Sequence, residues 1–302
     1  MSRDSVSFDS DKFDELDIDW EDIVTLRLAR PRVFRLTDGR ILEGTAELDD
    51  GVLRIATPDG RALDVPATDV VTITYLNSLG LRQWTVRIGG NLAARSGNTD
   101  QQDLGGNALI RRDATYTRWE TRYNGAFGSV DGKQTTNNHR ASTQIDWIVT
   151  NHFFLRVPSF EFYLDEFQNI DSRYTIGAGV GYEPVDTPIV LLRMTIGSAA
   201  QMTDFDGGGR STDAAILVGS ELDLDLPHDV DLDLVYSLQL LVTDIGRTAH
   251  ATSAVISFEI WGPFDLDVGA YWNRIEEPAR NSDGDKPRSD DFRLTVGVAL
   301  EF

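Results

Sequence analysis

Residues 292–302 read Phe-Arg-Leu-Thr-Val-Gly-Val-Ala-Leu-Glu-Phe, and every second residue, counted back from Leu300, is apolar. The intervening positions carry small, polar or charged side chains. Alternation with a period of two is typical of a β-strand with one apolar and one polar face. Its length fits a tilted membrane-spanning strand, which needs about 9–11 residues. The stretch therefore predicts a strand that meets a nonpolar environment on one side only.

The same alternation recurs from Trp84 to the end of the chain. Leu232, Leu234 and Tyr236, for example, alternate with Asp231, Asp233 and other polar residues. Strands of soluble proteins are most often about five or six residues long, whereas these segments are about twice as long. We predict twelve strands, at residues 84–94, 103–113, 117–128, 138–150, 152–165, 173–182, 189–201, 213–226, 230–242, 248–260, 264–274 and 290–302.

The segments between these strands alternate in length. We expect longer polar loops at 95–102, 129–137, 166–172, 202–212, 243–247 and 275–289. The connections between them are tight, at 114–116, 151, 183–188, 227–229 and 261–263. Long loops at one end and short turns at the other are typical of bacterial outer-membrane barrels. The pattern places both ends of the barrel segment at the short-turn, periplasmic end.

Composition narrows the class of protein. The chain has 302 residues, no cysteine, a formal net charge of −21 and a sequence pI near 4.4. Disulfides and thiolate metal sites are therefore absent, and nucleic-acid partners, which require a basic surface, are excluded. An acidic surface poor in lysine suits a salt-rich habitat. No apolar run reaches the length of a transmembrane helix, which leaves a β-barrel as the way to span a membrane.

Two shorter regions precede the barrel. Residues 1–22 are acidic and polar, and we expect a solvated tail or linker there. Residues 23–76 contain five or six short β-type runs, separated by Asp-Gly turns at 38–39, 50–51 and 59–60. This spacing predicts a small SH3-like or Sm-like β-domain. The first residues contain no apolar signal-peptide segment, so we expect a mature or truncated form of an exported protein.

Several residues after Trp84 carry a family resemblance. They are Gly97-Asn98-Thr99-Asp100, Asp165-Glu166-Phe167-Gln168 and the run Gly177-Ala178-Gly179-Val180-Gly181-Tyr182. Over residues 84–302 the chain resembles the family called domain of unknown function 481, whose members are described as salt-induced outer-membrane proteins. The resemblance implies an outer-membrane barrel and supplies no catalytic residue, substrate or cofactor. A terminal Phe302 resembles the signal that directs such barrels to the barrel-assembly machinery.

Strand parity also predicts which charged side chains face the barrel interior, because a charge on the lipid face costs several kcal/mol near the midplane. These lumen-facing candidates are Arg87, Arg118, Glu120, Arg122, Asp146, Glu161, Arg193, Glu221, Asp265, Arg293 and Glu301. They either form a selective polar path or pair with one another and fill the lumen. Twelve strands lie between the barrels that side chains fill and those that hold a channel, and we expect a filled or constricted lumen.

The sequence supports three functions in decreasing order. The first is a narrow pore or envelope protein associated with salt or osmotic stress. The second is a structural or docking protein whose residues 1–75 bind a periplasmic partner. The third is a lipid-modifying enzyme, for which His250 and Ser253 are the nearest candidates, although no acyl-transfer motif surrounds them. We therefore predict no enzyme activity, no catalytic residue, no cofactor and no metal, with the acidic loops at 204–209 and 281–291 solvated rather than holding Ca²⁺.

Overall fold

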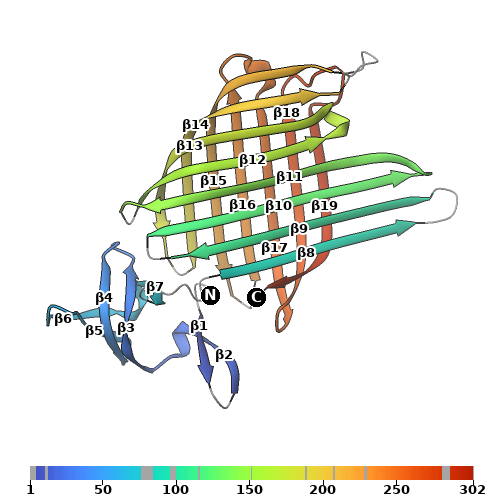
Figure 1. The fold of residues 1–302 in the computed structure, drawn as a ribbon. Coiled ribbons are helices and arrows are strands. Elements are labelled where there is room, and N and C mark those ends of the chain that lie inside the picture. Colours follow the sequence, from blue (N-terminus) through green and yellow to red (C-terminus); the bar gives the residue numbers. More distant parts are fainter. Residues whose placement is uncertain are drawn as a thin grey trace.

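The computed structural model describes residues 5–10, 13–75, 84–95, 100–114, 116–150, 152–187, 189–206, 208–227, 230–280 and 286–301. Their strands form three antiparallel sheets: a hairpin, a five-stranded sheet and a closed barrel (Figure 1). The chain is thus all-β, as predicted. Within the described ranges, no helix is long and apolar enough to cross a membrane.

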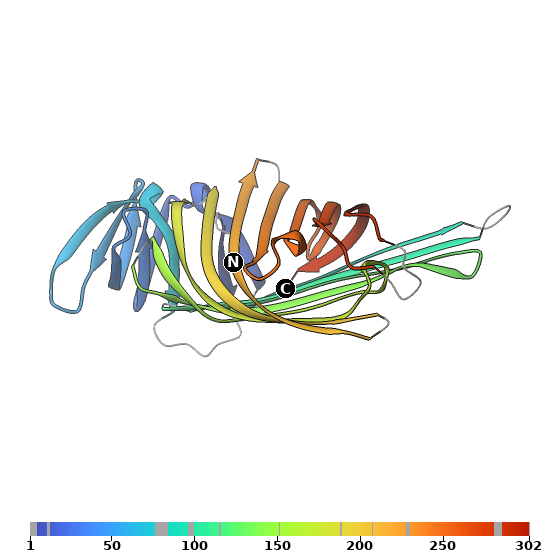
Figure 2. The same cartoon turned by 90° about the horizontal axis from the view of Figure 1, so that it is seen from above.

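The barrel consists of the twelve predicted strands, each paired antiparallel with its neighbours in sequence and closed by β19 against β8. The strands are β8 (Trp84–Arg95), β9 (Gln101–Asp113), β10 (Thr117–Val130), β11 (Lys133–Ile148), β12 (Phe153–Asp165), β13 (Ile170–Asp186), β14 (Val190–Phe205), β15 (Arg210–Leu226), β16 (Val230–Leu241), β17 (Ala249–Trp261), β18 (Phe264–Ile275) and β19 (Asp290–Glu301). Figure 2 shows two facing walls that make the barrel flattened rather than round.

The apolar side chains of the barrel point outward. Large hydrophobic residues are exposed on most strands, and Leu294, on the stretch that opened the sequence analysis, is 84% exposed. Charged side chains are instead buried inside, among them Arg118, Glu120, Asp146 and Arg193. Burial is therefore the reverse of a soluble protein, as expected of a barrel whose solvent is lipid.

The connections differ from the prediction at one hairpin. Residues 129–137 were expected to form a long loop, but β10 and β11 continue to a turn at residues 131–132. Asp131 and Gly132 both have positive φ, 51° and 75°, which is the geometry of a type I′ turn. The other connections at the same end are 96–100, 166–169, 206–209, 242–248 and 276–289, of which η4 (Glu166–Gln168) and η5 (Ile245–Arg247) are short 3-10 turns.

The five-stranded sheet has its own core. Its strands are β3 (Thr25–Leu36), β4 (Ile41–Asp49), β5 (Val52–Ala56), β6 (Ala62–Pro66) and β7 (Val70–Tyr75), with η2 (Ala67–Asp69) before the last. They pair in the order β6-β5-β4-β3-β7 and form an open half-barrel, the expected small SH3-like or Sm-like β-domain. Phe34, Leu53 and Ile55 are completely buried in it. The runs 24–28 and 33–36 are one strand with a register shift between Leu28 and Arg32.

The N-terminal region is not an irregular tail. β1 (Ser5–Ser10) and β2 (Phe13–Asp19) form a hairpin, followed by the 3-10 turn η1 (Trp20–Asp22). Trp20 packs against the core of the five-stranded sheet, and its Nε1 donates a hydrogen bond to the Ala67 carbonyl (3.0 Å). Cross-strand backbone pairing, which the acidic composition does not reveal, explains the difference from the predicted solvated segment.

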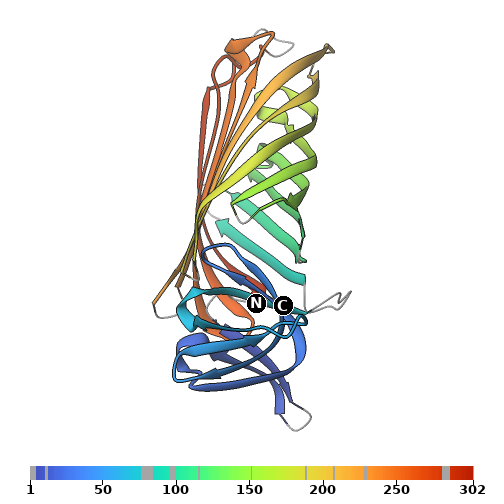
Figure 3. The ribbon, with the colours of Figure 1, turned by 90° about the vertical axis from the view of Figure 1, so that its left-hand side faces the viewer.

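The five-stranded sheet lies at the short-turn end of the barrel (Figure 3). Arg35 on β3 donates from Nη2 to Asp186 Oδ2 (2.5 Å), and Asp186 is the last residue of β13 before the turn to β14. Both side chains of this ion pair are largely buried. The short-turn end of the barrel is therefore in direct contact with the small sheet.

Candidate functional site

The barrel interior is the candidate site, because it gathers most of the buried charge of the molecule. Of the predicted lumen-facing residues, all except Arg293 take part in ion pairs with one another or with further interior charges. The further partners are Arg111, Asp113, Arg140, Arg156, Glu183, Asp233 and Asp267. Phe302, the predicted assembly signal, lies outside the described residues.

Five of these residues form a continuous chain of ion pairs that we call the charge belt: Arg118, Glu183, Arg193, Glu221 and Arg122. Glu183 Oε1 accepts from Arg118 Nη2 (2.9 Å) and from Arg193 Nε (3.0 Å). Glu221 accepts from Arg193 Nη1 and from Arg122 Nη2, both at 2.5 Å. The belt leaves β10 at Arg118, passes through β13, β14 and β15, and returns to β10 at Arg122.

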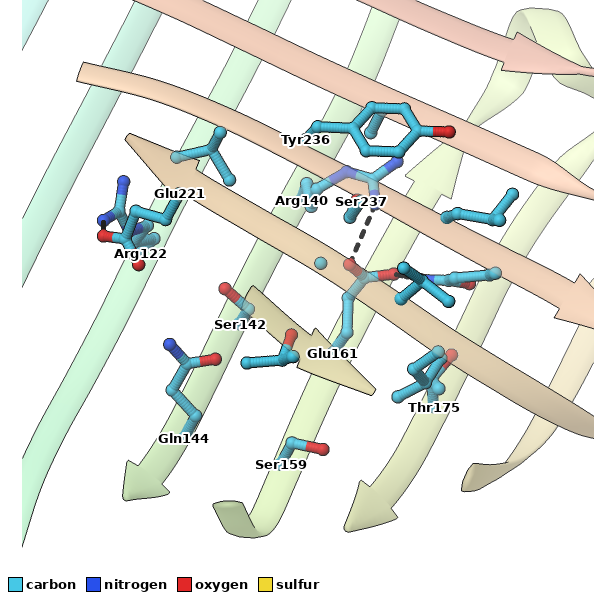
Figure 4. Close-up of a pocket in the computed structure, with 18 of the residues that line it drawn as sticks. Arg122, Arg140, Ser142, Gln144, Ser159, Glu161, Thr175, Glu221, Tyr236 and Ser237 are labelled. Carbon is cyan, nitrogen blue, oxygen red and sulfur yellow. Dashed lines mark hydrogen bonds and ion pairs between the residues drawn. The ribbon is translucent and has the colours of Figure 1, made fainter. Parts of the chain in front are cut away.

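The bond between Arg122 and Glu221 crosses the lumen, because β10 and β15 belong to opposite walls of the barrel (Figure 4). Arg122 also pairs with Glu120 (2.8 Å) and Asp233 (3.3 Å). A buried ion pair is stable only when its geometry is good and each charge has further hydrogen bonds. The belt meets this condition by giving each carboxylate two or more arginines, and it narrows the lumen at this level.

A second connection across the lumen is a hydrogen-bonded chain. Glu161 on β12 accepts from Arg140 Nη1 (2.8 Å) and from Gln239 Nε2 of β16 (2.7 Å). Gln239 Oε1 in turn accepts from Gln201 Nε2 of β14 (2.8 Å). Between this chain and the charge belt lies a cavity of about 270 Å³ whose lining includes Arg122, Arg140, Glu161 and Glu221 (Figure 4). The lumen is thus divided by side chains, with a small polar chamber between two crossings.

A third cluster lies at the closure of the barrel. Arg87 on β8 contacts Asp265 (2.7 Å) and Asp267 (2.5 Å) of β18 and Glu301 (2.8 Å) of β19. These contacts connect three neighbouring strands where the last strand meets the first. Their position at the end of the barrel indicates a role in closing the wall.

The glycines of β13 make room for side chains inside the barrel. A Cβ on Gly181 would overlap the ring of Phe154, and one on Gly179 would lie 2.5 Å from the Ile196 carbonyl oxygen. Phe154 is buried between the guanidinium groups of Arg118 (5.8 Å) and Arg156 (5.5 Å). The run 177–181 therefore serves packing in a strand and forms no nucleotide-binding loop.

The geometry of His250 and Ser253 does not form a hydrolase dyad. His250 Nδ1 is 3.0 Å from the Tyr236 hydroxyl, and its ring stacks on Trp272, so it lies on the outer face. Ser253 lines the interior cavity, on the opposite face of the same strand. Among the residues that the structure describes, no group of three or more His, Asp and Glu is placed to hold a metal ion.

Sequence reasoning missed several interior charges for identifiable reasons. Glu183 was assigned to a turn because β13 was expected to end at 182, although the strand continues to Asp186. Arg156 lies below an irregularity at 157–158 that changes the strand parity. Arg111 and Arg140 share the parity of residues that were chosen, so the same signal would have found them.

Comparison with known proteins identifies the family but no activity. Among solved structures, the NanC porin is 12% identical, aligned over 72% of this chain and 98% of its own, with a TM-score of 0.43. A porin solved at 1.8 Å is 8% identical over 90% of this chain and 98% of its own, with a TM-score of 0.34. These likenesses concern the barrel fold alone. A search of curated proteins finds no match. The family model for proteins of unknown function named DUF481 matches residues 86–302, so the chain belongs to the DUF481 family, as its sequence motifs predicted.

Proposed function

We propose that this DUF481 protein is an outer-membrane β-barrel whose lumen is a narrow conduit for small polar solutes. The apolar exterior and charged interior support a membrane location, and a closed barrel needs no other element to span the bilayer. The observation that carries the conduit is the bond between Arg122 and Glu221, which crosses the lumen beside a polar chamber of about 270 Å³. Such a lumen admits small solutes and restricts larger ones.

Recording from the full-length protein in planar lipid bilayers tests this function. We expect small, discrete conductance steps for the wild type. The double variant Arg122→Ala/Glu221→Ala removes opposite charges and the bond across the lumen, so we expect its unit conductance to be at least about twofold larger. Arg54→Ala/Asp64→Ala removes an exposed ion pair from the small sheet and serves as the matched control with wild-type conductance. Absence of steps from every variant contradicts the conduit.

The second candidate is a structural or docking protein whose small β-domain binds an envelope partner. The buried ion pair between Arg35 and Asp186 supports it, because a sheet held against the barrel end presents its remaining surface in a fixed direction. This function predicts no conductance. It also predicts that deleting residues 1–75 leaves an assembled barrel that no longer co-purifies with a partner.

Two further aspects belong to the same proposal. A periplasmic position for residues 23–76 is supported by their contact with the short-turn end of the barrel. Protease added to intact cells should leave this domain uncut and should cut it once the outer membrane is permeabilised. A role in salt or osmotic stress rests on the sequence resemblance and the net charge of −21. A deletion strain should then grow more slowly than its parent only at raised salt.

A further inference from the structure

Arg293 is the exception among the predicted interior charges. It lies on β19, lines the chamber, and has no carboxylate within ion-pair distance in the described part of the chain. Its Nε and Nη1 atoms are buried and have no hydrogen-bond partner there. Asp291, on the same face of β19, forms no ion pair with it among the described residues. The guanidinium is therefore held inside the barrel with donors unused.

Tyr271 fixes the position of this guanidinium. The two residues are cross-strand partners on β18 and β19, and the Arg293 Cζ lies 4.5 Å from the centre of the Tyr271 ring. A cation over an aromatic face is stabilised by about 0.5–2 kcal/mol, but this contact leaves the in-plane N–H groups available. Arg293 is thus oriented without being neutralised.

The chamber as a whole carries an excess of positive charge. Its lining includes five arginines and three glutamates and no aspartate, in a protein whose formal net charge is −21. The glutamates are each paired with arginine, by Arg111 and Arg122 at Glu120, Arg140 at Glu161, and Arg193 at Glu221. An anion entering the chamber therefore meets arginine donors whose charge no neighbouring carboxylate fully balances.

We propose that the chamber binds a small organic anion through its carboxylate, with Arg293 as the principal contact. The planar guanidinium presents Nε and an Nη in the fork geometry that matches a carboxylate. Asn273 and Ser253 also line the chamber and supply hydrogen-bonding groups for hydroxyls of such a solute. The volume of about 270 Å³ lies just below the range of about 300–1,000 Å³ typical of ligand pockets, which favours a short, polar acid.

This inference deepens the proposed conduit and rests on it for transport, but binding can be measured separately. Gluconate, a small polyhydroxy acid, is titrated calorimetrically into the full-length protein in detergent. We expect saturable binding to the wild type, an affinity at least tenfold weaker for Arg293→Gln, and partial recovery for Arg293→Lys. Arg274→Gln is the matched control, because Arg274 lies on β18 near the same end of the barrel and pairs with Glu276 and Asp290 on the outer side. It should bind gluconate as the wild type does.

Reversal potentials in a potassium gluconate gradient give the second measurement. We expect the wild-type gluconate-to-potassium permeability ratio to fall at least threefold in Arg293→Gln and to stay unchanged in Arg274→Gln. Absence of gluconate binding to the wild type, or equal affinity in Arg293→Gln, overturns the inference. Binding that depends on Arg293 in a protein without any conductance supports the site and contradicts the conduit, so the two failures are distinguishable.

Discussion

Gly181 illustrates how a single residue decides the packing inside this barrel. It lies on β13 directly opposite Phe154 of β12, whose ring occupies the space that a side chain at Gly181 would need. The ring in turn contacts Arg118 and Arg156, which belong to the buried ion pairs at this end of the lumen. A change at Gly181 is therefore transmitted to two interior cations.

Gly181→Ala is expected to destabilise the folded barrel by about 1–3 kcal/mol, the usual cost of adding a methyl group to a closely packed interior. Guanidinium unfolding of the protein in detergent, followed by tryptophan fluorescence, measures this change. Gly209→Ala is the control, because a Cβ at Gly209 meets nothing within 4 Å. Equal stability of the two variants would show that Phe154 moves aside without cost.

At the scale of elements, the strands were predictable and two hairpins were not. Alternation located all twelve barrel strands because each has one lipid-facing and one interior face. The turn at 131–132 contains Asp-Gly, the same cue that marked turns in residues 23–76, but the polar residues around it resemble a loop. β1 and β2 are held by pairing with each other, which composition does not encode. Local pattern thus predicts strands better than it predicts where they stop.

The closure of the barrel is its shortest interface between strands. β19 and β8 pair from Val298–Gly90 to Glu301–Arg87, whereas β14 and β15 pair from Val190–Leu224 to Asp204–Arg210. Above the closure, Leu92 and Val296 would be opposite each other if the register continued, yet they are not paired, and both are largely exposed. The two strands therefore separate toward the loop end.

Cysteine cross-linking tests this separation, since the native chain contains no cysteine. Ile88→Cys/Leu300→Cys replaces paired residues on the outer face, and oxidation should join them, because paired Cα atoms lie within disulfide range. Leu92→Cys/Val296→Cys has the same parity four residues further along each strand and should remain reduced. Equal cross-linking of both pairs, detected by mobility on a denaturing gel, would mean that the strands pair along their whole length.

The whole molecule combines two opposite patterns of burial. In the five-stranded sheet, apolar side chains such as Phe34 and Leu53 are buried, whereas in the barrel the buried residues are largely charged. Sequence parity could predict the interior face of each barrel strand, because that depends on alternation along one strand. It could not predict that Arg122 meets Glu221, since contacts across the lumen depend on the stagger and flattening of all twelve strands.

Separate sheets with separate cores predict that the small domain can unfold while the barrel stays intact. Ile55→Asp places a charge in the fully buried core of β5, which costs more than a small domain's stability. Limited proteolysis should then remove the N-terminal region rapidly, while the barrel keeps its folded mobility on an unheated SDS gel. Val52→Asp changes an exposed residue of the same strand and should leave both parts resistant. Loss of the folded barrel in Ile55→Asp alone would mean that the ion pair between Arg35 and Asp186 joins the two parts into one cooperative unit.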